Sequence, residues 1–131
     1  MQWRPEFATG DPQIDEPHRT LFASADQFRE ALDANQGEQT YDLFLQFLAA
    51  YAAVHFGVEE ECMNVRKCPV AARNKVEHES FLKLVAAESE RFSQHGFDHD
   101  VAVSLLDRID NWLSSHICRI DVKLRDAPIA P

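Results

Sequence analysis

The chain has 131 residues, of which 45% are hydrophobic, and this is enough for one domain with one core. Its 22 acidic and 13 basic side chains leave a formal charge of -9, which repels phosphate backbones and anionic lipids. We therefore expect neither nucleic acid nor a membrane as a partner. The amino-terminal MQWRPEFATGDP has no apolar stretch long enough for a secretory signal, and the apolar region 43–54 is too short to span a bilayer. These features predict a soluble, cytoplasmic protein.

The chain has three cysteines, Cys62, Cys68 and Cys118, which are scattered without CxxC spacing. Such a set suggests neither a disulfide framework nor a thiolate zinc site, so we expect reduced, buried thiols. Cys62 follows Glu59 by three residues on one helical face, and we expect it to contribute packing.

Four long segments carry apolar residues at helical spacing, and short stretches with Gly, Asn, Pro or Asp separate them. The expected limits are a first helix whose stripe covers 18–32 and which ends near 35–37, a second over about 40–64, a third from Pro69 to Gly96, and a fourth that starts near 98–100. The inner face of the second is predicted to carry Phe44, Phe47, Leu48, Tyr51, His55, Val58 and Cys62. The inner face of the third is predicted to carry Asn74, His78, Phe81, Val85, Ser89 and Phe92.

Short connections make consecutive helices antiparallel neighbours. The sequence therefore predicts an all-α, up-down-up-down antiparallel four-helix bundle. We expect residues 1–131 to form a single domain, with 1–14 as an arm laid over the bundle and 126–131 as a linker-like tail.

Each of the four apolar stripes contains one histidine: His18, His55, His78 and His116. A single histidine on an apolar face is usually a hydrogen-bonded core residue. Four of them around one axis would each need a separate partner, whereas one metal site satisfies all four, so the pattern favours a metal centre. The other two histidines, His95 and His99, fall in the connection before the fourth helix and are predicted to be solvated.

Two carboxylates accompany these histidines. Glu59 follows His55 by four residues, so both side chains project from one face of the second helix. Asp121 follows His116 by five, which places it about 140° away on a regular helix, and the spacing alone does not choose between a ligand and a solvated or capping carboxylate. Imidazoles with carboxylates and no thiolate suit iron or manganese and are compatible with zinc. Two carboxylates also suggest two metal ions.

Several separated motifs resemble the hemerythrins, specifically the bacterial hemerythrin-like domains, over nearly the whole chain. The motifs are IDEPH at 14–18, HFGVEEECM at 55–63, EHESFL at 77–82 and NWLSSHICRID at 111–121. The resemblance implies a non-haem di-iron centre that binds dioxygen, or another small exogenous ligand, reversibly or senses it.

Carried over position by position, the implied iron ligands are His18, His55, Glu59, His78, His116 and Asp121. In the family's pattern the two carboxylates bridge the irons together with a solvent-derived oxygen. The first two histidines then bind one iron, and the last two bind the other.

One position departs from the family's third-helix motif, which is His, three residues, His. The first of these is Asn74 in NKVEH, so the iron of His78 and His116 loses one imidazole. Asn74 could offer a weak carbonyl ligand, point away or leave room for water. Glu77 and Glu79 lie about 100° around the helix from His78, and we do not expect them to substitute. We expect a looser centre with two exchangeable positions, which favours redox change or peroxide chemistry over oxygen storage.

Three hypotheses follow for the function. The leading one is a sensing module whose oxygen or redox state alters a partner protein or an attached signalling domain. The second is a di-iron oxidase or peroxidase that uses the extra open position, and the third is a bundle with a mononuclear or empty site that acts by interaction alone. No separate general acid or base remains among the buried ionisable residues, and this disfavours the enzyme.

Overall fold

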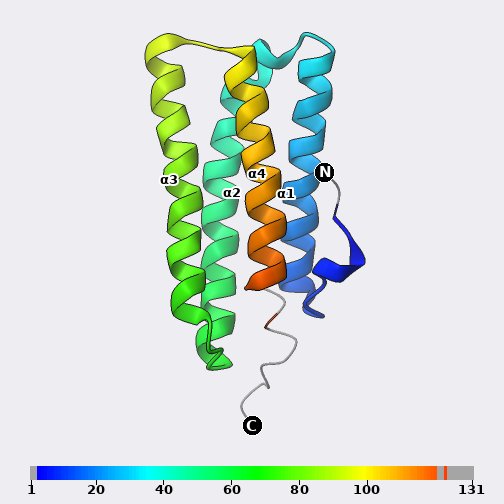
Figure 1. Cartoon of the computed structure of the whole chain (residues 1–131), viewed down its shortest axis with the longest axis vertical. Helices are drawn as coiled ribbons and strands as arrows, with labels where there is room; N and C mark the ends of the chain where they lie inside the picture. The colour runs from blue at the N-terminus through cyan, green and yellow to red at the C-terminus, as the bar shows by residue number, and fades with distance from the viewer. Residues whose placement is uncertain (1–2, 121–122, 124–131) are drawn as a thin grey trace.

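A computed structural model describes residues 3–120 and 123. In these residues every regular element is helical, and four helices lie side by side with alternating directions (Figure 1). The elements are the 3-10 helix η1 (Pro5–Phe7), α1 (Pro12–Asp33), α2 (Gly37–Val65), α3 (Ala71–His95) and α4 (His99–Arg119). The all-α, up-down-up-down bundle predicted from the sequence is confirmed.

Side-chain caps and short turns set the ends of the helices. The Asp11 side chain accepts a hydrogen bond from the Gln13 amide, and the Asp98 side chain accepts from the amides of Asp100 and Val101. Gly96 ends α3 with a φ of 79°, which a side-chain-bearing residue rarely adopts. The three connections are therefore short, and they keep consecutive helices antiparallel.

Two predicted boundaries were wrong. The first helix begins at Pro12, so it takes in the last residues of the segment 1–14 that was assigned to the arm, because Asp11 caps it there. His95 and His99, predicted in a connection, are the last residue of α3 and the first residue of α4. Both are exposed, as expected. The predicted tail 126–131 lies outside the described residues.

The amino-terminal segment is fixed to the side of α1 (Figure 1). The buried Asp15 carboxylate accepts hydrogen bonds from the amide and hydroxyl of Thr9, both at 2.8 Å, and from the Gly10 amide at 3.1 Å. The Arg19 guanidinium lies 4.1 Å from the Trp3 ring centroid. The segment is thus an ordered cover over one side of the bundle, as the sequence indicated.

The apolar core consists of two clusters of buried residues with a polar layer between them. The larger cluster fills most of the bundle, and the smaller one consists of Ile14, Met63, Cys68 and Ile120. On α1 the buried His18 lies between Ile14 of the small cluster and Leu21 of the large one. On α4 the buried His116 lies in the same way between Leu113 and Ile120. Apolar layers therefore close the histidine level from both ends of the bundle.

The predicted inner face of α2 was partly wrong. Val58 is 39% exposed, while Phe47, Tyr51 and Cys62 are only half-buried. The fully buried face instead carries Tyr41, Leu45, Ala52, Phe56 and Glu59. The reason is that α2 is apolar on both sides, so periodicity alone does not fix which side faces the core.

A second polar group is buried near the start of α2 and the end of α3. The Tyr41 hydroxyl donates to the Glu88 carboxylate, which also accepts from Arg91 at 2.5 Å and 3.1 Å. Burial and the Glu88 carboxylate raise the pKa of Tyr41. Glu88 is buried where the sequence placed Ser89, because its charge is balanced by Arg91 within the same helix. We call these three residues the Tyr41 cluster.

Candidate metal centre

Five of the six predicted ligands meet in the polar layer between the two apolar clusters. All four helices contribute to this group, and each of its side chains is at most 3% exposed. Its members, called the histidine–Glu59 cluster below, are His18 on α1, His55 and Glu59 on α2, His78 on α3 and His116 on α4. Asp121 lies outside the described residues, and its role as a ligand stays a prediction.

The two oxygens of Glu59 face different pairs of histidines. Oε2 lies 3.3 Å from Nε2 of His18 and 3.2 Å from Nε2 of His55. Oε1 lies 3.0 Å from Nε2 of His78 and 3.5 Å from Nε2 of His116. Each pair and its oxygen form a group whose ligand atoms lie within 4.8 Å of one another. The arrangement is that of two three-residue cation sites which share one carboxylate.

The contact of His116 with Glu77 indicates which nitrogen of its ring is available to a metal ion. Its Nδ1 lies 3.0 Å from Oε1 of Glu77, whose other oxygen accepts from Arg73 at 3.2 Å. A carboxylate only accepts hydrogen bonds, so Nδ1 of His116 is the donor in this contact, and Nε2, which faces Glu59, is the nitrogen available to a metal ion. The donor set therefore fits a metal ion.

Two further carboxylates contact the Nδ1 atoms of His78 and His116, the ring nitrogens that do not face Glu59. Besides the contact between Glu77 and His116, Glu60 Oε2 lies 3.6 Å from Nδ1 of His78. Such partners fix the ring orientation and increase the basicity of a metal-ligating imidazole. Spacing along the sequence does not indicate either contact, because each joins residues on different helices.

Aromatic rings pack against the same two histidines. Phe56 stacks on His78 with centroids 3.9 Å apart, and Trp112 stacks on His116 at 4.5 Å. These rings exclude water from the layer, which strengthens electrostatic interactions inside it. Trp112 is half-buried and forms part of the surface.

Asn74 lies on α3 one turn before His78 and is completely buried. Its side chain therefore does not turn to solvent. Glu77 reaches His116 from the side of Nδ1, which is the far side of the ring from Glu59, and Glu79 is exposed. That neither glutamate replaces the missing imidazole stays a prediction.

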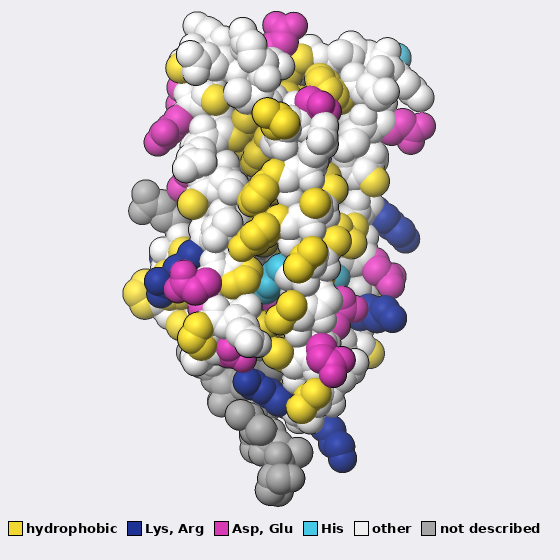
Figure 2. Space-filling view, turned by 180° about the vertical axis from the view of Figure 1, so that it is seen from behind, with side chains coloured by type: hydrophobic (Ala, Val, Ile, Leu, Met, Phe, Trp, Pro, Cys, Tyr) yellow, Lys and Arg dark blue, Asp and Glu magenta, His cyan; other side chains and the backbone are white. Residues whose placement is uncertain are grey.

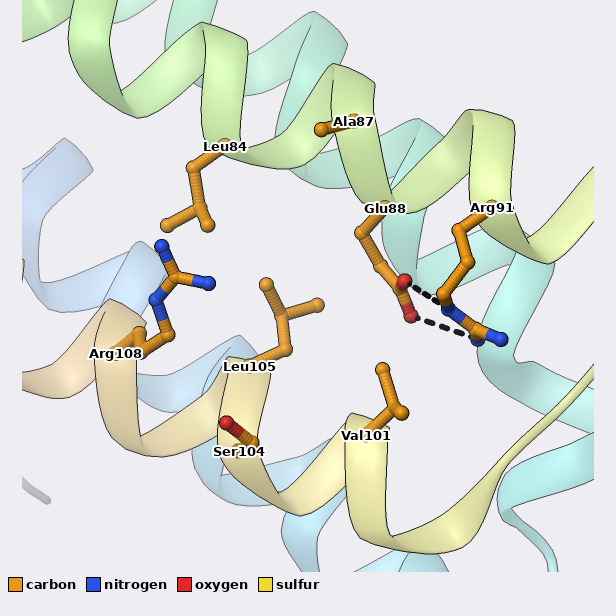
Figure 3. Close-up of a pocket in the computed structure, with 8 residues that line it drawn as sticks. All are labelled: Leu84, Ala87, Glu88, Arg91, Val101, Ser104, Leu105 and Arg108. Carbon is orange, nitrogen blue, oxygen red and sulfur yellow. Dashed lines mark hydrogen bonds and ion pairs between the residues drawn. The ribbon is translucent and has the colours of Figure 1, made fainter.

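Two surface grooves lie between α3 and α4. One, of about 570 Å³, is lined by Ser80, Leu84, Arg108, Asn111, Trp112 and Ser115, so its wall is the ring that stacks on His116. The second, of about 350 Å³, shares Leu84 and Arg108 with it; in Figure 3 Arg108 extends toward Leu84, while the ion-paired Glu88 and Arg91 lie away from it. The first groove brings the surface to within one aromatic ring of the histidine–Glu59 cluster.

The three cysteines are free, as predicted, but only Cys68 is buried. Cys118 is exposed. Cys62 packs against the small apolar cluster, and burial, followed by the nearby Asp11 carboxylate, raises the pKa of its thiol. A raised pKa disfavours the reactive thiolate, so these observations give Cys62 a packing role.

Comparison with known proteins agrees with this geometry. The family model described as Hemerythrin HHE cation binding domain matches residues 9–125. The Bacteriohemerythrin of Clostridium acetobutylicum is 32% identical over 91% of this chain and 94% of its own length. The Bacteriohemerythrin of Stenotrophomonas maltophilia is 30% identical over 89% of this chain and 74% of its own length, and that of Methylococcus capsulatus is 27% identical over 92% and 91%.

Proposed function

The chain belongs to the hemerythrin family, and from this premise we propose that it senses dioxygen or redox state through two iron ions held inside the bundle. Hemerythrins bind dioxygen at iron, and this coarser function applies to the chain as a member of the family. The proposal adds the number of irons, the ligands and the sensing role. The regulated element would be a partner protein or an attached signalling domain in the cytoplasm.

The observation that carries the proposal is the division of the Glu59 carboxylate between two pairs of histidines. One oxygen faces His18 and His55, and the other faces His78 and His116, at 3.0–3.5 Å. Ligand atoms that share one cation, each about 2.0–2.2 Å from it, have separations of this order. Asp121 would supply the second bridging carboxylate.

Bound iron supplies a redox-active Lewis acid to which a small exogenous ligand such as dioxygen binds. The chain supplies the rest of the chemistry. Glu77 holds the proton on Nδ1 of His116, so that Nε2 keeps its lone pair for the metal. Phe56 and Trp112 exclude water from the two histidines, and the groove beside Trp112 is a route by which a small ligand would approach them.

Asn74 supports sensing over storage. It occupies the position from which the family's pattern would present a third imidazole to the ion of His78 and His116. A site with fewer strong ligands exchanges ligands and changes oxidation state more easily, which suits a switch. An oxidase or peroxidase would use the same open position, but the described cluster offers no spare acid or base for it.

The test is iron analysis of purified protein, combined with visible spectra before and after reduction in the presence and absence of air. We expect two irons per chain and a spectrum that changes reversibly with oxidation state. One metal ion at full occupancy would contradict the di-iron proposal, and turnover of an added organic substrate would favour the enzyme.

A further inference from the structure

The outward side of α2 is apolar, unlike the outward sides of the other helices. Of the five large apolar side chains that are exposed in the described part of the chain, four lie on this helix: Leu43, Val54, Val58 and Val65, at 69%, 71%, 39% and 54% exposure. At about 100° per residue they fall within about 60° of each other around the helix. They form one stripe, on the side of α2 that faces away from Glu59 and the core.

The same stretch of α2 carries no charge. Between Asp42 and Glu59 the residues 43–58 include no Asp, Glu, Lys or Arg, although 27% of the chain is charged. This segment is about 24 Å long as a helix. Figure 2 shows apolar side chains running down the middle of this face, with charged side chains near its edges and ends. Exposed apolar patches of this kind usually mark an interaction surface.

The bundle itself does not explain this side of α2. By length and composition α2 is apolar enough to cross a membrane, but its opposite side supplies His55 and Glu59 to the interior. Gly57 lies in the middle of the exposed side, and a Cβ atom added there would meet nothing within 4 Å. Glycine inside a helix costs about 0.5–1 kcal/mol relative to alanine. No contact with the described residues, 3–120 and 123, accounts for that cost, whereas an approaching backbone from outside would.

We propose that this surface, the outer α2 face, joins two copies of the chain into a homodimer whose α2 helices pack antiparallel around a two-fold axis near Ala50. The outer α2 face comprises Leu43, Phe47, Ala50, Val54, Gly57 and Val58.

Charge favours a second copy as the occupant. Each chain carries a formal charge of -9, so contacts through the charged faces would bring like charges together. A two-fold contact places the same surface on both sides. Residues 43–58 can therefore be buried against themselves with no charge lost from water on either side, and desolvated unpaired charge is the main penalty in such contacts.

The order of side chains favours the antiparallel arrangement. An axis near Ala50 places Leu43 opposite Val58 and Phe47 opposite Val54, so each larger side chain meets a smaller one. The exposed Glu61, on the same side of α2, would then face Thr40 of the second copy. In a parallel arrangement Glu61 would face Glu61 of the second copy, and the two carboxylates would repel each other. A groove of about 380 Å³ beside Leu43 and Phe47, between α1 and α2, offers space for side chains of the second copy.

The contact area sets the expected strength. A strip about 24 Å long and, with the adjoining edges of α1 and α3, about 20 Å wide covers roughly 500 Å² per copy. Stable interfaces bury about 800 Å² per partner, and smaller ones are transient. We therefore expect a dimer that dissociates on dilution in the micromolar range.

The first experiment is sedimentation equilibrium of the iron-loaded protein from low micromolar to near millimolar concentration. Val54→Glu should raise the dimer dissociation constant more than tenfold, because it places two carboxylates in the apolar contact. Val76→Glu is the matched control, since Val76 is a 63% exposed valine on α3, and it should dimerise like the wild type. Iron content should be the same in all three proteins, so the outcome is independent of the proposed sensing function.

The second experiment tests the position of the axis. In a Cys118→Ser background, which removes the exposed thiol, Ala50→Cys should form a covalent dimer when diamide oxidises its thiols, whereas Val76→Cys should not. A wild type that remains monomeric at every concentration would overturn the proposal, and so would one that instead binds neutral phospholipid vesicles through Val54. Equal cross-linking of the two cysteine variants would overturn the antiparallel arrangement.

Discussion

Glu59 and Glu88 are both buried carboxylates, but the groups around them differ in kind. Glu88, in the Tyr41 cluster, accepts from a phenol and from a guanidinium that holds it with two nitrogens, so donors of its own chain surround it. Glu59 is surrounded by four imidazoles at 3.0–3.5 Å. One of these, His116, contacts Glu77 through Nδ1 and turns Nε2 toward Glu59.

The comparison shows that burial of a charged group does not by itself identify a functional site. A cluster of a phenol, a guanidinium and a carboxylate supplies its own donors and stabilises the fold, whereas imidazoles that converge on one carboxylate form a ligand set for a cation from outside. The two clusters are also well separated, since Glu59 follows Tyr41 by 18 residues on α2, about 27 Å along the helix. They can therefore be changed independently.

The largest expected difference comes from removing each carboxylate. Glu59→Ala should abolish binding of both irons, because both histidine pairs lose their shared ligand. Glu88→Ala should keep its iron but lose about 1–3 kcal/mol of folding free energy, because the Tyr41 hydroxyl and Arg91 lose their buried acceptor. Iron analysis after desalting and urea unfolding measure the two effects.

The control for this pair is His95→Ala, which removes an exposed imidazole at the end of α3 and should change neither quantity. Equal iron retention in Glu59→Ala, Glu88→Ala and His95→Ala would show that the ligand set is wrong. Circular dichroism of Glu59→Ala checks that its helices still form.

The next effect concerns Glu77, which acts on iron only through His116. Glu77→Gln keeps the shape of the side chain but removes the charge that holds the proton on Nδ1, so we expect iron affinity to fall about 10–100-fold. A shift of the reduction potential should accompany this loss. Arg73→Gln, which removes only the exposed ion-pair partner of Glu77, should have a smaller effect on both. An unchanged potential in Glu77→Gln would contradict the positioning role.

A smaller effect should appear in the Tyr41 cluster at high pH. The folded state raises the pKa of Tyr41, so folding favours the protonated phenol. In the unfolded chain tyrosine ionises at about pH 10. The contribution of Tyr41 to the free energy of unfolding should therefore be fully present below about pH 10, and the free energy of unfolding should fall by about 1.4 kcal/mol per pH unit above it. Urea unfolding between pH 9 and pH 11, roughly one unit on either side of that value, measures this slope. Tyr41→Phe should lose the part of this slope that comes from ionisation of Tyr41. An identical slope in both proteins would show that the fall in stability does not come from Tyr41.

The sequence predicted the bundle and much of the candidate site because both depend on local spacing. One histidine on each apolar stripe, and Glu59 four residues after His55, are patterns within single helices, and the structure brings all five side chains together. The contacts of Glu77 with His116 and of Glu60 with His78 join different helices, so no spacing within one helix could indicate them.

Two errors have the same kind of cause. Val58 was placed inside because α2 is apolar on both sides, and periodicity identifies an inner face only when the outer face is polar. Ser89 was placed on the inner face where the structure buries Glu88, because a carboxylate is normally solvated and the balance of this one by Tyr41 depends on the packing of α2 against α3. When the burial of a side chain depends on contacts with a second helix, the residue pattern of its own helix does not predict it.

The smallest predicted effect concerns Asn74, the position where the chain departs from its family's pattern. Asn74→His would present an imidazole one turn before His78, at the spacing of four that puts two side chains on one helical face. Because Asn74 is fully buried beside this histidine, the new ring should face the same layer. We expect the variant to hold its iron more tightly, and its reduced form to survive several-fold longer in air.

The measurement is stopped-flow oxidation of reduced wild type and variant, with iron content determined on the same samples. Asn64→His, which adds an imidazole at an exposed position of α2, is the matched control and should oxidise like the wild type. Slower oxidation in Asn74→His alone would mean that the missing imidazole keeps the centre open to rapid redox change, as a sensor requires. If the variant binds iron and oxidises no differently from a wild type that is already slow, Asn74 has no functional consequence and storage becomes the better description.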